Sequence, residues 1–365
     1  MKILHTETLP KWGGQQNKVL KELKAARSLG HDVFLVCNPG AVIGERARSF
    51  DIPVTEIRMT KKTYHQTVPA LMRFIQSNEI DIVVSHGSTD SWIVAVAGNL
   101  SKRKPFLIRE RHNLFPIKGT LSRWQHRSLF DRIIAISESV KNYLLEIGVP
   151  ENKIFFLPST VDTHHFDATE EILTRQFDIP EHHTIVGMFA DLTRKKGVFD
   201  FAEAASILLK RHADITVVFA GSYLPRIKEE IDALLEKYGL NPNERIVWTG
   251  RCEDAATIMK GFDIYIYPSH TEGLGTVIIE GMAAKLPLIV YDIEPMNRLV
   301  ENGVRGLTAP YKNPGKLAEC ATHLIENEME RRTMARAAHD FVLQNYSDDI
   351  LVEKMEELLE GVHGQ

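Results

Sequence analysis

The sequence predicts an α/β protein made of two doubly wound domains, and three observations carry that prediction. Short apolar runs rich in β-branched residues alternate with helical patterns. This alternation pauses over a polar stretch at residues 159–183 and then starts again. The chain has 365 residues, 44% of them hydrophobic, which is more than one core usually holds. Alternation of this kind is typical of parallel sheets covered by helices on both faces.

The first series of elements predicts a parallel sheet in the N-terminal half. Its expected strands cover residues 2–6, 32–37, 80–85, 105–109, 132–136 and 153–157. A helix is expected between the first two of them, over residues 15–29, because Leu20, Leu23 and Ala26 share one face. Gly30 then supplies the left-handed residue that ends such helices.

The second series predicts a similar sheet in the C-terminal half. Its expected strands cover residues 184–189, 215–220, 245–249, 264–267 and 286–290. We therefore expect an N-terminal domain over residues 1–165 and a C-terminal domain over residues 166–345. Ligands of open parallel sheets bind at the carboxyl ends of the strands, so the post-strand loops are where chemistry is expected.

Composition excludes several classes of protein. No run of about 18 apolar residues occurs, which argues against a spanning helix or a signal peptide and leads us to expect a cytoplasmic protein. The three cysteines are far apart and fit neither a disulfide framework nor a zinc site. Two pairs of adjacent histidines, at 164–165 and 182–183, lack the spacing of three or four residues that helical metal ligands use. We expect no metal site.

Charge is divided unevenly along the chain. Residues 1–165 carry 23 Lys and Arg against 15 Asp and Glu, and the remaining residues carry 21 against 33. A basic half can attract an anionic acceptor or a lipid headgroup surface, although solvated helix faces explain most such imbalances. The division is compatible with a peripheral membrane contact and does not require one.

The segment at residues 269–280 carries the strongest chemical signal. It follows a buried strand and opens a helix, and Gly273 and Gly275 let the backbone come close to a ligand. The free amides and the positive end of that helix suit a diphosphate. Glu280 lies one turn below Thr276, where its carboxylate could accept from ribose hydroxyls, and Glu272 stays in the loop. The plain alternative is a helix whose glutamates complement its dipole and face water.

The spacing of these two glutamates points to a family. The segment Glu-Gly-Leu-Gly-Thr-Val-Ile-Ile-Glu-Gly-Met-Ala, starting at Glu272, resembles the signature of glycosyltransferase family 4. The resemblance extends over essentially the whole chain. It implies the GT-B fold, two Rossmann-like domains facing across a cleft, with the C-terminal helix of residues 346–363 packed back on the first domain. It also implies transfer of a sugar from a nucleotide-diphosphate sugar with retention of configuration, without a metal or another cofactor.

The resemblance assigns donor contacts to both halves of the chain. In the C-terminal domain, the segment that ends Arg194-Lys195-Lys196-Gly197 corresponds to the loop that brings an arginine and a lysine to the phosphates. Lys196 matches the lysine, and either Arg194 or Lys195 could substitute for the arginine because Asp191 occupies the usual place. The helix-opening segment adds the donor-binding residues Gly273, Leu274, Gly275, Thr276 and Glu280. In the N-terminal domain, Gly13 and Gly14 resemble the glycine loop that faces the donor, although glycine pairs are also common in tight turns.

The resemblance also assigns the reaction centre and the acceptor side. His86 matches the active-site histidine beside the transferred sugar, and Glu272 is expected to position that sugar rather than attack it. Arg109, Arg111 and His112 resemble an Arg-x-Arg-His run in members that build bacterial envelope polysaccharides, and they could bind an anionic acceptor. The plain alternative for this run is an exposed loop in which Glu110 pairs with the arginines.

These residues lead to one expected function and two alternatives. The expected partners are a nucleotide sugar and a glycan or lipid-linked acceptor such as lipopolysaccharide, with possible peripheral membrane contact and no nucleic acid. Arg298 stands where many members have a glutamate, so the identity of the sugar stays open. The alternatives are a nucleotide-sugar epimerase on a GT-B frame and a catalytically degenerate binding subunit.

Overall fold

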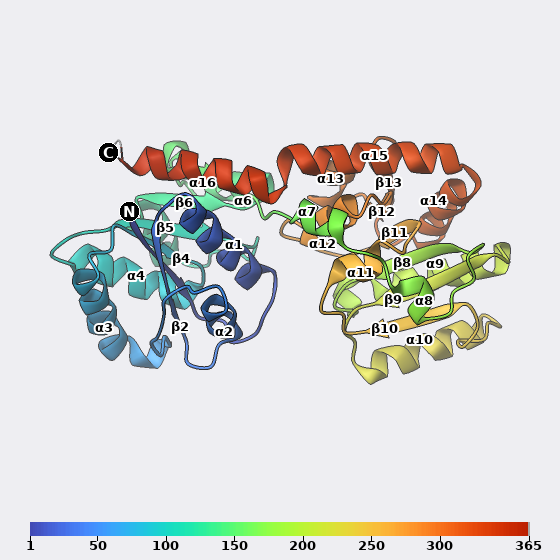
Figure 1. Cartoon of the computed structure of the whole chain (residues 1–365), viewed down its shortest axis with the longest axis horizontal. Helices are drawn as coiled ribbons and strands as arrows, with labels where there is room; N and C mark the ends of the chain where they lie inside the picture. The colour runs from blue at the N-terminus through green and yellow to red at the C-terminus, as the bar shows by residue number, and fades with distance from the viewer. Residues whose placement is uncertain (364–365) are drawn as a thin grey trace. The chain divides into compact units, whose positions relative to one another are not determined.

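The computed structural model describes residues 1–363, which form two compact units (Figure 1). Unit 1 contains Met1–Thr160 and the C-terminal helix α16 (Asp348–His363), and unit 2 is Val161–Ser347. The chain therefore passes between the units at Thr160–Val161 and at Ser347–Asp348, a few residues from the boundaries expected at 165 and 345.

Unit 1 is built on a seven-stranded parallel sheet with the strand order β3-β2-β1-β4-β5-β6-β7. The strands are β1 (Lys2–Glu7), β2 (Asp32–Cys37), β3 (Val54–Glu56), β4 (Ile82–Ser85), β5 (Phe106–Arg111), β6 (Arg132–Ala135) and β7 (Ile154–Phe156). Six of them correspond to the strands predicted from the sequence. The edge strand β3 was not predicted, because its three half-exposed residues carry no run of apolar side chains.

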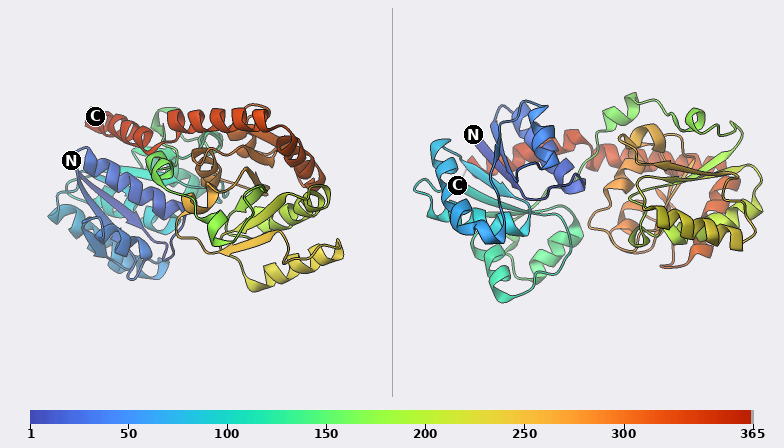
Figure 2. Two further views of the ribbon diagram at one scale, coloured as in Figure 1. Left: turned by 45° about the vertical axis from the view of Figure 1, so that its right-hand side comes forward. Right: turned by 90° about the horizontal axis from the view of Figure 1, so that it is seen from below.

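Helices lie on both faces of this sheet (Figures 1 and 2). They are α1 (Gly14–Ser28), α2 (Val42–Arg48), α3 (Tyr64–Ser77), α4 (Ser88–Leu100), α5 (Thr120–Ser128), α6 (Glu138–Glu146) and α16. Helix α1 buries Leu20, Leu23 and Ala26, as its apolar spacing predicts. The helix ends at Ser28, and Gly30 follows it with φ +82°, a left-handed backbone that costs a glycine little.

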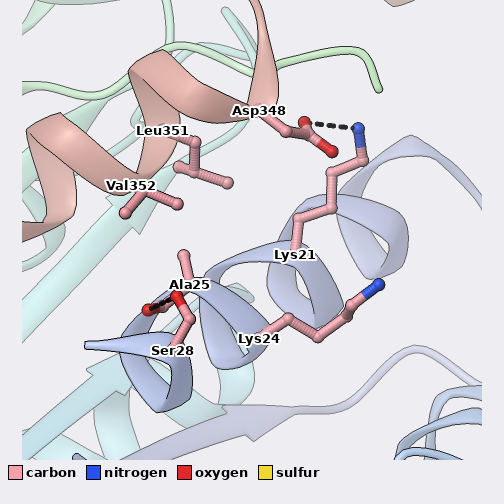
Figure 3. A pocket seen from close by; sticks show the side chains of 7 residues that line it. All are labelled: Lys21, Lys24, Ala25, Ser28, Asp348, Leu351 and Val352. Carbon is pink, nitrogen blue, oxygen red and sulfur yellow. Dashed lines mark hydrogen bonds and ion pairs between the residues drawn. The ribbon is translucent and has the colours of Figure 1, made fainter. Parts of the chain in front are cut away.

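The C-terminal helix α16 packs on α1 (Figure 3). Its buried residues Leu351, Met355, Leu358 and Leu359 follow helical spacing and join the core of unit 1. At the start of α16, Oδ1 of Asp348 accepts from Lys21 Nζ at 2.8 Å and from Thr160 Oγ1 at 2.7 Å. The two segments that connect the units, at Thr160 and at Asp348, are thus hydrogen-bonded to each other within unit 1. They lie beside a cavity of about 220 Å³ between α1 and α16.

Unit 2 contains a six-stranded parallel sheet with the order β10-β9-β8-β11-β12-β13. Its strands are β8 (Thr184–Phe189), β9 (Ile215–Ala220), β10 (Ile246–Gly250), β11 (Ile264–Tyr267), β12 (Leu288–Tyr291) and β13 (Gly306–Ala309). Five match the predicted strands, and the short edge strand β13 was not predicted. Its helices are α7 (Thr163–Ala168), α8 (Leu173–Gln176), α9 (Val198–Arg211), α10 (Pro225–Lys237), α11 (Ala255–Met259), α12 (Thr276–Ala283), α13 (Met296–Val300), α14 (Pro314–Glu326) and α15 (Glu328–Asn345).

The strand orders fix where each unit can hold a ligand. In unit 1 the order reverses between β1 and β4, and in unit 2 it reverses between β8 and β11. Loops that leave neighbouring strands at such a point diverge to opposite faces of the sheet and open a crevice at the carboxyl ends. The residues predicted to bind ligands follow these strands and the adjacent β5. Among the described residues, none of the helices is apolar and long enough to span a bilayer.

Candidate active site

Two loops of unit 2 meet at its strand-order reversal. The 3-10 turn Arg194–Lys196 follows β8, and the segment from Ser269 to Gly275 follows β11. Gly197 has φ +76°, and a Cβ atom there would lie 1.9 Å from the carbonyl oxygen of Pro268, so only glycine fits this approach. The amide of His270 donates to the carbonyl of Lys195 at 2.9 Å. These contacts hold the two predicted phosphate-side segments together.

Glu272 is the centre of this arrangement. Its Oε1 accepts from Lys196 Nζ at 2.6 Å, from Ser269 Oγ at 2.8 Å and from the hydroxyl of Tyr267. Burial and the charge of Glu272 raise the pKa of Tyr267 well above its ordinary value, so this hydroxyl stays a donor. A carboxylate held by three donors is suited to fixing a ligand's position, and its nucleophilicity is reduced.

The helix that follows Glu272 presents its N-terminus to the same place. Gly275 precedes α12 with φ +83°, and no described side chain caps the helix there. The amides of its first turn are therefore available to an anion. Leu274 is buried in the unit, whereas Glu280 lies half-buried on the helix, one turn beyond Thr276. Burial, and then the charges of Glu280 and Glu272, raise the pKa of Tyr265, which places both carboxylates near that ring.

The other predicted donor residues of unit 2 lie apart from Glu272. Arg194 pairs with Glu230, and its guanidinium lies 4.0 Å from the ring centre of Phe199. Asp191 accepts from the hydroxyl of Ser222. Arg194 and Asp191 both line a separate cavity of about 340 Å³. In this conformation, the basic turn contributes Lys196 alone to the contacts of Glu272.

Sequence reasoning missed a group of three polar residues beside this site. Asp200, on α9, accepts from the hydroxyl of Tyr291 at 2.6 Å and lies 3.0 Å from Nε2 of His270. These bonds join the ends of β11 and β12 to the start of α9. Nothing in the local sequence indicates the contact, because its three members are separated by up to 91 residues. Arg298, which departs from the family pattern, is exposed and pairs with Glu294 at 2.7 Å.

In unit 1, His86 follows β4 and belongs to a buried cluster of charged side chains. Its Nδ1 lies 3.0 Å from Oε2 of Glu110, and its Nε2 lies 2.9 Å from Nδ1 of His5. Burial lowers the pKa of His86, but the carboxylates around it, Glu110 above all and then Glu22 and Glu7, together raise it above its ordinary value. Burial holds the pKa of His5 low, so His5 accepts a hydrogen from His86. With no exposed side-chain surface, His86 has both ring nitrogens engaged within the protein.

Lys18 and Glu22 complete this cluster, and no pattern in the sequence indicated either residue. Lys18 Nζ lies 2.9 Å from Oε1 of Glu110 and also pairs with Glu22, one turn further along α1. All three side chains are at most 2% exposed. Lys18 and a protonated His86 lie against Glu110. Glu22 shares Lys18 with Glu110, so each ionised carboxylate of the cluster has a cationic partner in the core.

His112 and His86 are the members of this cluster that line a cavity. Nε2 of His112 lies 3.0 Å from His86 Nδ1, and the cavity measures about 520 Å³. Burial lowers the pKa of His112 to about 3, so its ring is neutral at ordinary pH. The atoms of His86, Glu110 and His112 lie close enough together to hold a metal ion, but the ammonium of Lys18 already supplies a cation to Glu110.

The structure corrects the interpretation of the Arg-x-Arg-His run as an exposed loop paired with Glu110. Arg109 and Arg111 belong to β5 and are buried, and Glu110 points to the opposite face, where it meets Lys18. Arg109 Nη1 donates to the carbonyl of Gly87 at 2.7 Å, and Arg111 donates to the carbonyl of Phe115. Both arginines line the same cavity as His86 and His112.

The predicted glycine loop lies at the carboxyl end of β1. Gly13 is fully extended, with φ −171°, and Gly14 is the first residue of α1. Neither glycine has a left-handed backbone, so the pair opens a helix and does not form a left-handed turn.

Comparisons with known proteins identify the family of the chain. A model described as Glycosyltransferase Family 4 matches residues 12–165, and one described as Glycosyl transferases group 1 matches residues 169–341. A galactosyltransferase of Escherichia coli, named UDP-Gal:alpha-D-GlcNAc-diphosphoundecaprenol alpha-1,3-galactosyltransferase, is 24% identical over 332 residues, covering 84% of this chain and 83% of its own.

Solved structures share the fold over nearly the full length. A glycosyltransferase from Rickettsia africae ESF-5 superposes with a TM-score of 0.90 at 22% identity, covering 99% of this chain and 98% of its own. Anabaena Alr3699/HepE in complex with UDP-glucose superposes with a TM-score of 0.83 at 18% identity, covering 99% and 100%. The two sheets and their strand orders are those of the GT-B fold. The chain is an enzyme that belongs to the glycosyltransferases, with a family 4 module followed by a group 1 module.

Proposed function

We propose that the chain transfers a sugar, with retention of configuration, from a nucleotide-diphosphate sugar to a hydroxyl of a growing cell-envelope glycan, either lipopolysaccharide or a lipid-linked oligosaccharide. The observation that carries the proposal is the pairing of Lys196 with Glu272 beside the uncapped N-terminus of α12. A cation, a helix N-terminus and a fixed carboxylate at one strand-order reversal are what a sugar diphosphate requires. The relative from Escherichia coli is named for a lipid-diphosphate acceptor, which supports the acceptor class.

In this proposal unit 2 binds the donor. The leaving diphosphate gains negative charge as its bond to the sugar breaks, and the first-turn amides of α12 with Lys196 stabilise that charge. Glu280 accepts from the ribose, and Glu272 positions the sugar while the donor phosphate helps to deprotonate the acceptor hydroxyl. Because protein groups supply the positive charge, we propose that transfer needs no metal and no other cofactor.

Unit 1 binds the acceptor in the same proposal. Arg109, Arg111 and His112 line its cavity, with His86 behind them. Beside this cavity lies a group of exposed apolar side chains that we call the α5 patch, made of Leu114, Phe115, Leu121 and Trp124. Exposed Lys118, Arg123 and Arg127 stand among them. Aromatic and leucine side chains interleaved with basic ones suit the surface of an anionic membrane, and we propose peripheral membrane contact here.

Calorimetry tests the donor site. We expect one of UDP, GDP or ADP to bind equally well in EDTA and in magnesium, with affinity at least tenfold lower in Lys196→Ala and in Glu280→Ala. Lys195→Ala, a neighbouring lysine outside the Glu272 pair, is the matched control and should bind like the wild type. If none of the three nucleotides binds, or if binding requires magnesium, the donor site is misassigned.

A second assay separates transfer from epimerisation. Incubation of the chosen donor with and without a lipid-diphosphate glycan, followed by NMR of the anomeric proton, reports both the acceptor requirement and the configuration. We expect an acceptor-dependent product whose new bond keeps the donor's anomeric configuration. An inverted product, or an epimerised donor formed without acceptor, would contradict the proposal.

A further inference from the structure

The cavity of unit 1 has an unusual electrostatic lining. It measures about 520 Å³ and lies at the ends of β4 and β5, against the loop that leads to α5. Arg109, Arg111 and Lys118 contribute three positive charges to its wall. Among the described residues that line it, none is an aspartate or a glutamate. A concave surface with cations and no acids concentrates a positive potential inside it.

Both arginines are buried without a carboxylate partner. Arg109 is 2% exposed and Arg111 is 9% exposed, and neither forms an ion pair within the described part of the chain. Their hydrogen bonds go to neutral acceptors, the carbonyls of Gly87 and Phe115 and the ring of His126. Burial lowers the pKa of Arg109 to about 10. Lys18 is equally buried, but it lies against the two carboxylates of Glu22 and Glu110. A buried cation with a purely structural role in unit 1 is therefore paired, unlike the two arginines.

Within residues 1–363, none of the carboxylates around these arginines forms an ion pair with them, although Oδ1 of Asp90 is buried without a hydrogen-bond partner. Glu110 points to the other face of β5. Asp90 attracts Arg109 from a distance, but its Oδ2 accepts from Thr6 Oγ1 at 3.0 Å and from the amide of His86 at 2.8 Å. Glu7 accepts from the amides of its own loop and from Gln15. The charge of the arginines is therefore left for a ligand.

His126 holds Arg109 in place for such a ligand. Its Nδ1 lies 2.7 Å from the carbonyl oxygen of Ser122, which can only accept, so Nδ1 carries the hydrogen. Nε2 is then free to accept from Arg109 Nε at 2.9 Å. This neutral tautomer fixes the guanidinium without cancelling its charge, and we regard His126 as a positioning residue.

We propose that this cavity binds a phosphoryl group, with Arg109, Arg111 and Lys118 as its cations, and that this group belongs to the acceptor. A guanidinium matches a phosphate oxygen pair in a fork, and a ligand without an anion would leave two buried charges unpaired. The assignment of the group to the acceptor rests on the proposed function. The donor's diphosphate has the same chemistry, so the test has to separate the two sources.

Calorimetry of the full chain with three probes makes that separation: inorganic pyrophosphate, UDP and a water-soluble short-chain prenyl diphosphate. The variants are Arg111→Gln, the exposed Lys118→Gln, and Lys196→Ala in unit 2. Arg103→Gln, an exposed arginine of unit 1 that pairs with Asp81, is the control. We expect Arg111→Gln to weaken prenyl diphosphate binding at least tenfold and Lys118→Gln at least fivefold, and both to leave UDP binding within twofold of the wild type. Lys196→Ala should weaken UDP binding and leave prenyl diphosphate binding unchanged. In Lys196→Ala, part of the pyrophosphate binding should remain, and Arg111→Gln should remove that part.

Three results would overturn the proposal. Prenyl diphosphate could bind all variants alike, Lys196→Ala alone could remove every phosphate ligand, or Arg111→Gln could abolish UDP binding in a chain whose circular dichroism is unchanged. The last result would assign the arginines to the donor. Lys118→Gln guards against misfolding, because an exposed lysine does not support the core. If the wild type binds none of UDP, GDP and ADP, the proposed function is contradicted, and the prenyl diphosphate result can still be interpreted.

Discussion

At the scale of single residues, the two buried carboxyls that share Lys18 in unit 1 have pKa values shifted in opposite directions. Glu110 meets Lys18 and His86, and although burial opposes them these cations hold its pKa well below the ordinary value. Glu22 shares Lys18 with Glu110, and burial together with the charge of Glu110 raises its pKa to about 7. One carboxyl is therefore ionised at neutral pH, and the other is poised to take up a proton.

Glu22 makes stability depend on pH in a defined direction. Its pKa is about 7 in the folded chain against an ordinary value of 4.5, so the folded state binds a proton that the unfolded state releases. This stabilisation is complete below about pH 4.5 and is lost as pH rises through 7. In urea unfolding, Glu22→Gln should gain stability relative to the wild type as pH rises from 5 to 8, by on the order of 3 kcal/mol.

The exposed Glu45 on α2 offers the matched control for that measurement. Glu45→Gln removes a surface carboxylate from the same unit, and its difference from the wild type should stay constant across the pH series. A constant difference for Glu22→Gln as well would show that Glu22 is not protonated in the folded chain.

At the scale of elements, the donor site depends on how closely the turn after β8 approaches the end of β11. Gly197 allows that approach for two separate reasons, its positive φ and the lack of a Cβ atom beside Pro268. Gly239, after α10, has nearly the same φ of +74°, but a Cβ atom there would have no neighbour within 4 Å. The two glycines therefore separate backbone strain from close packing.

Alanine at these two positions should have unequal effects. Gly239→Ala should cost about 1 kcal/mol of unfolding free energy, as is usual for a left-handed alanine. Gly197→Ala should cost clearly more, and it should also weaken nucleotide binding because Lys196 moves away from Glu272. Thermal unfolding and calorimetry measure both effects. Equal losses of stability with unchanged nucleotide binding would rule out this role of Gly197.

At the scale of the whole molecule, charge and exposed apolar surface coincide. Residues 1–160 of unit 1 carry 23 Lys and Arg against 14 Asp and Glu, whereas residues 348–365 of the same unit carry one against six. The basic excess therefore belongs to the part of unit 1 that also carries the α5 patch and the cavity beside it. Helix α5 buries only Gln125 and His126, so its apolar side chains do not serve the core. An acceptor with a lipid tail could enter such a cavity from the membrane surface.

Vesicle sedimentation tests this surface. The wild type should bind vesicles that contain anionic lipid, and binding should fall with rising salt because Lys118, Arg123 and Arg127 are exposed. The double variant Phe115→Ser with Trp124→Ser should bind at least fivefold less. Leu224→Ser removes an equally exposed apolar side chain from unit 2 and should bind like the wild type. Equal binding by the two variants would exclude the α5 patch as the contact.

The sequence by itself determined the two-domain α/β architecture, most of the strands and the family. Those properties rest on hydrophobic periodicity and on the contiguous segment from Glu272 to Glu280. Such local patterns can be recognised in the sequence alone, without knowledge of the fold. Sequence patterns missed β3 and β13, since these edge strands, unlike the Ile-Phe-Phe run of β7, carry no run of large apolar side chains.

Only the tertiary structure decided which of the predicted residues meet. Lys196 pairs with Glu272, whereas Arg194 pairs with Glu230. Glu110 pairs with Lys18 and not with the arginines on either side of it in the sequence. The alternation of side chains along β5 and the crossing of distant strands at a sheet reversal set these pairings. Partners separated by tens of residues share no local signal, so the buried cluster around Lys18 and the acid-free cavity beside it form only when the chain is folded.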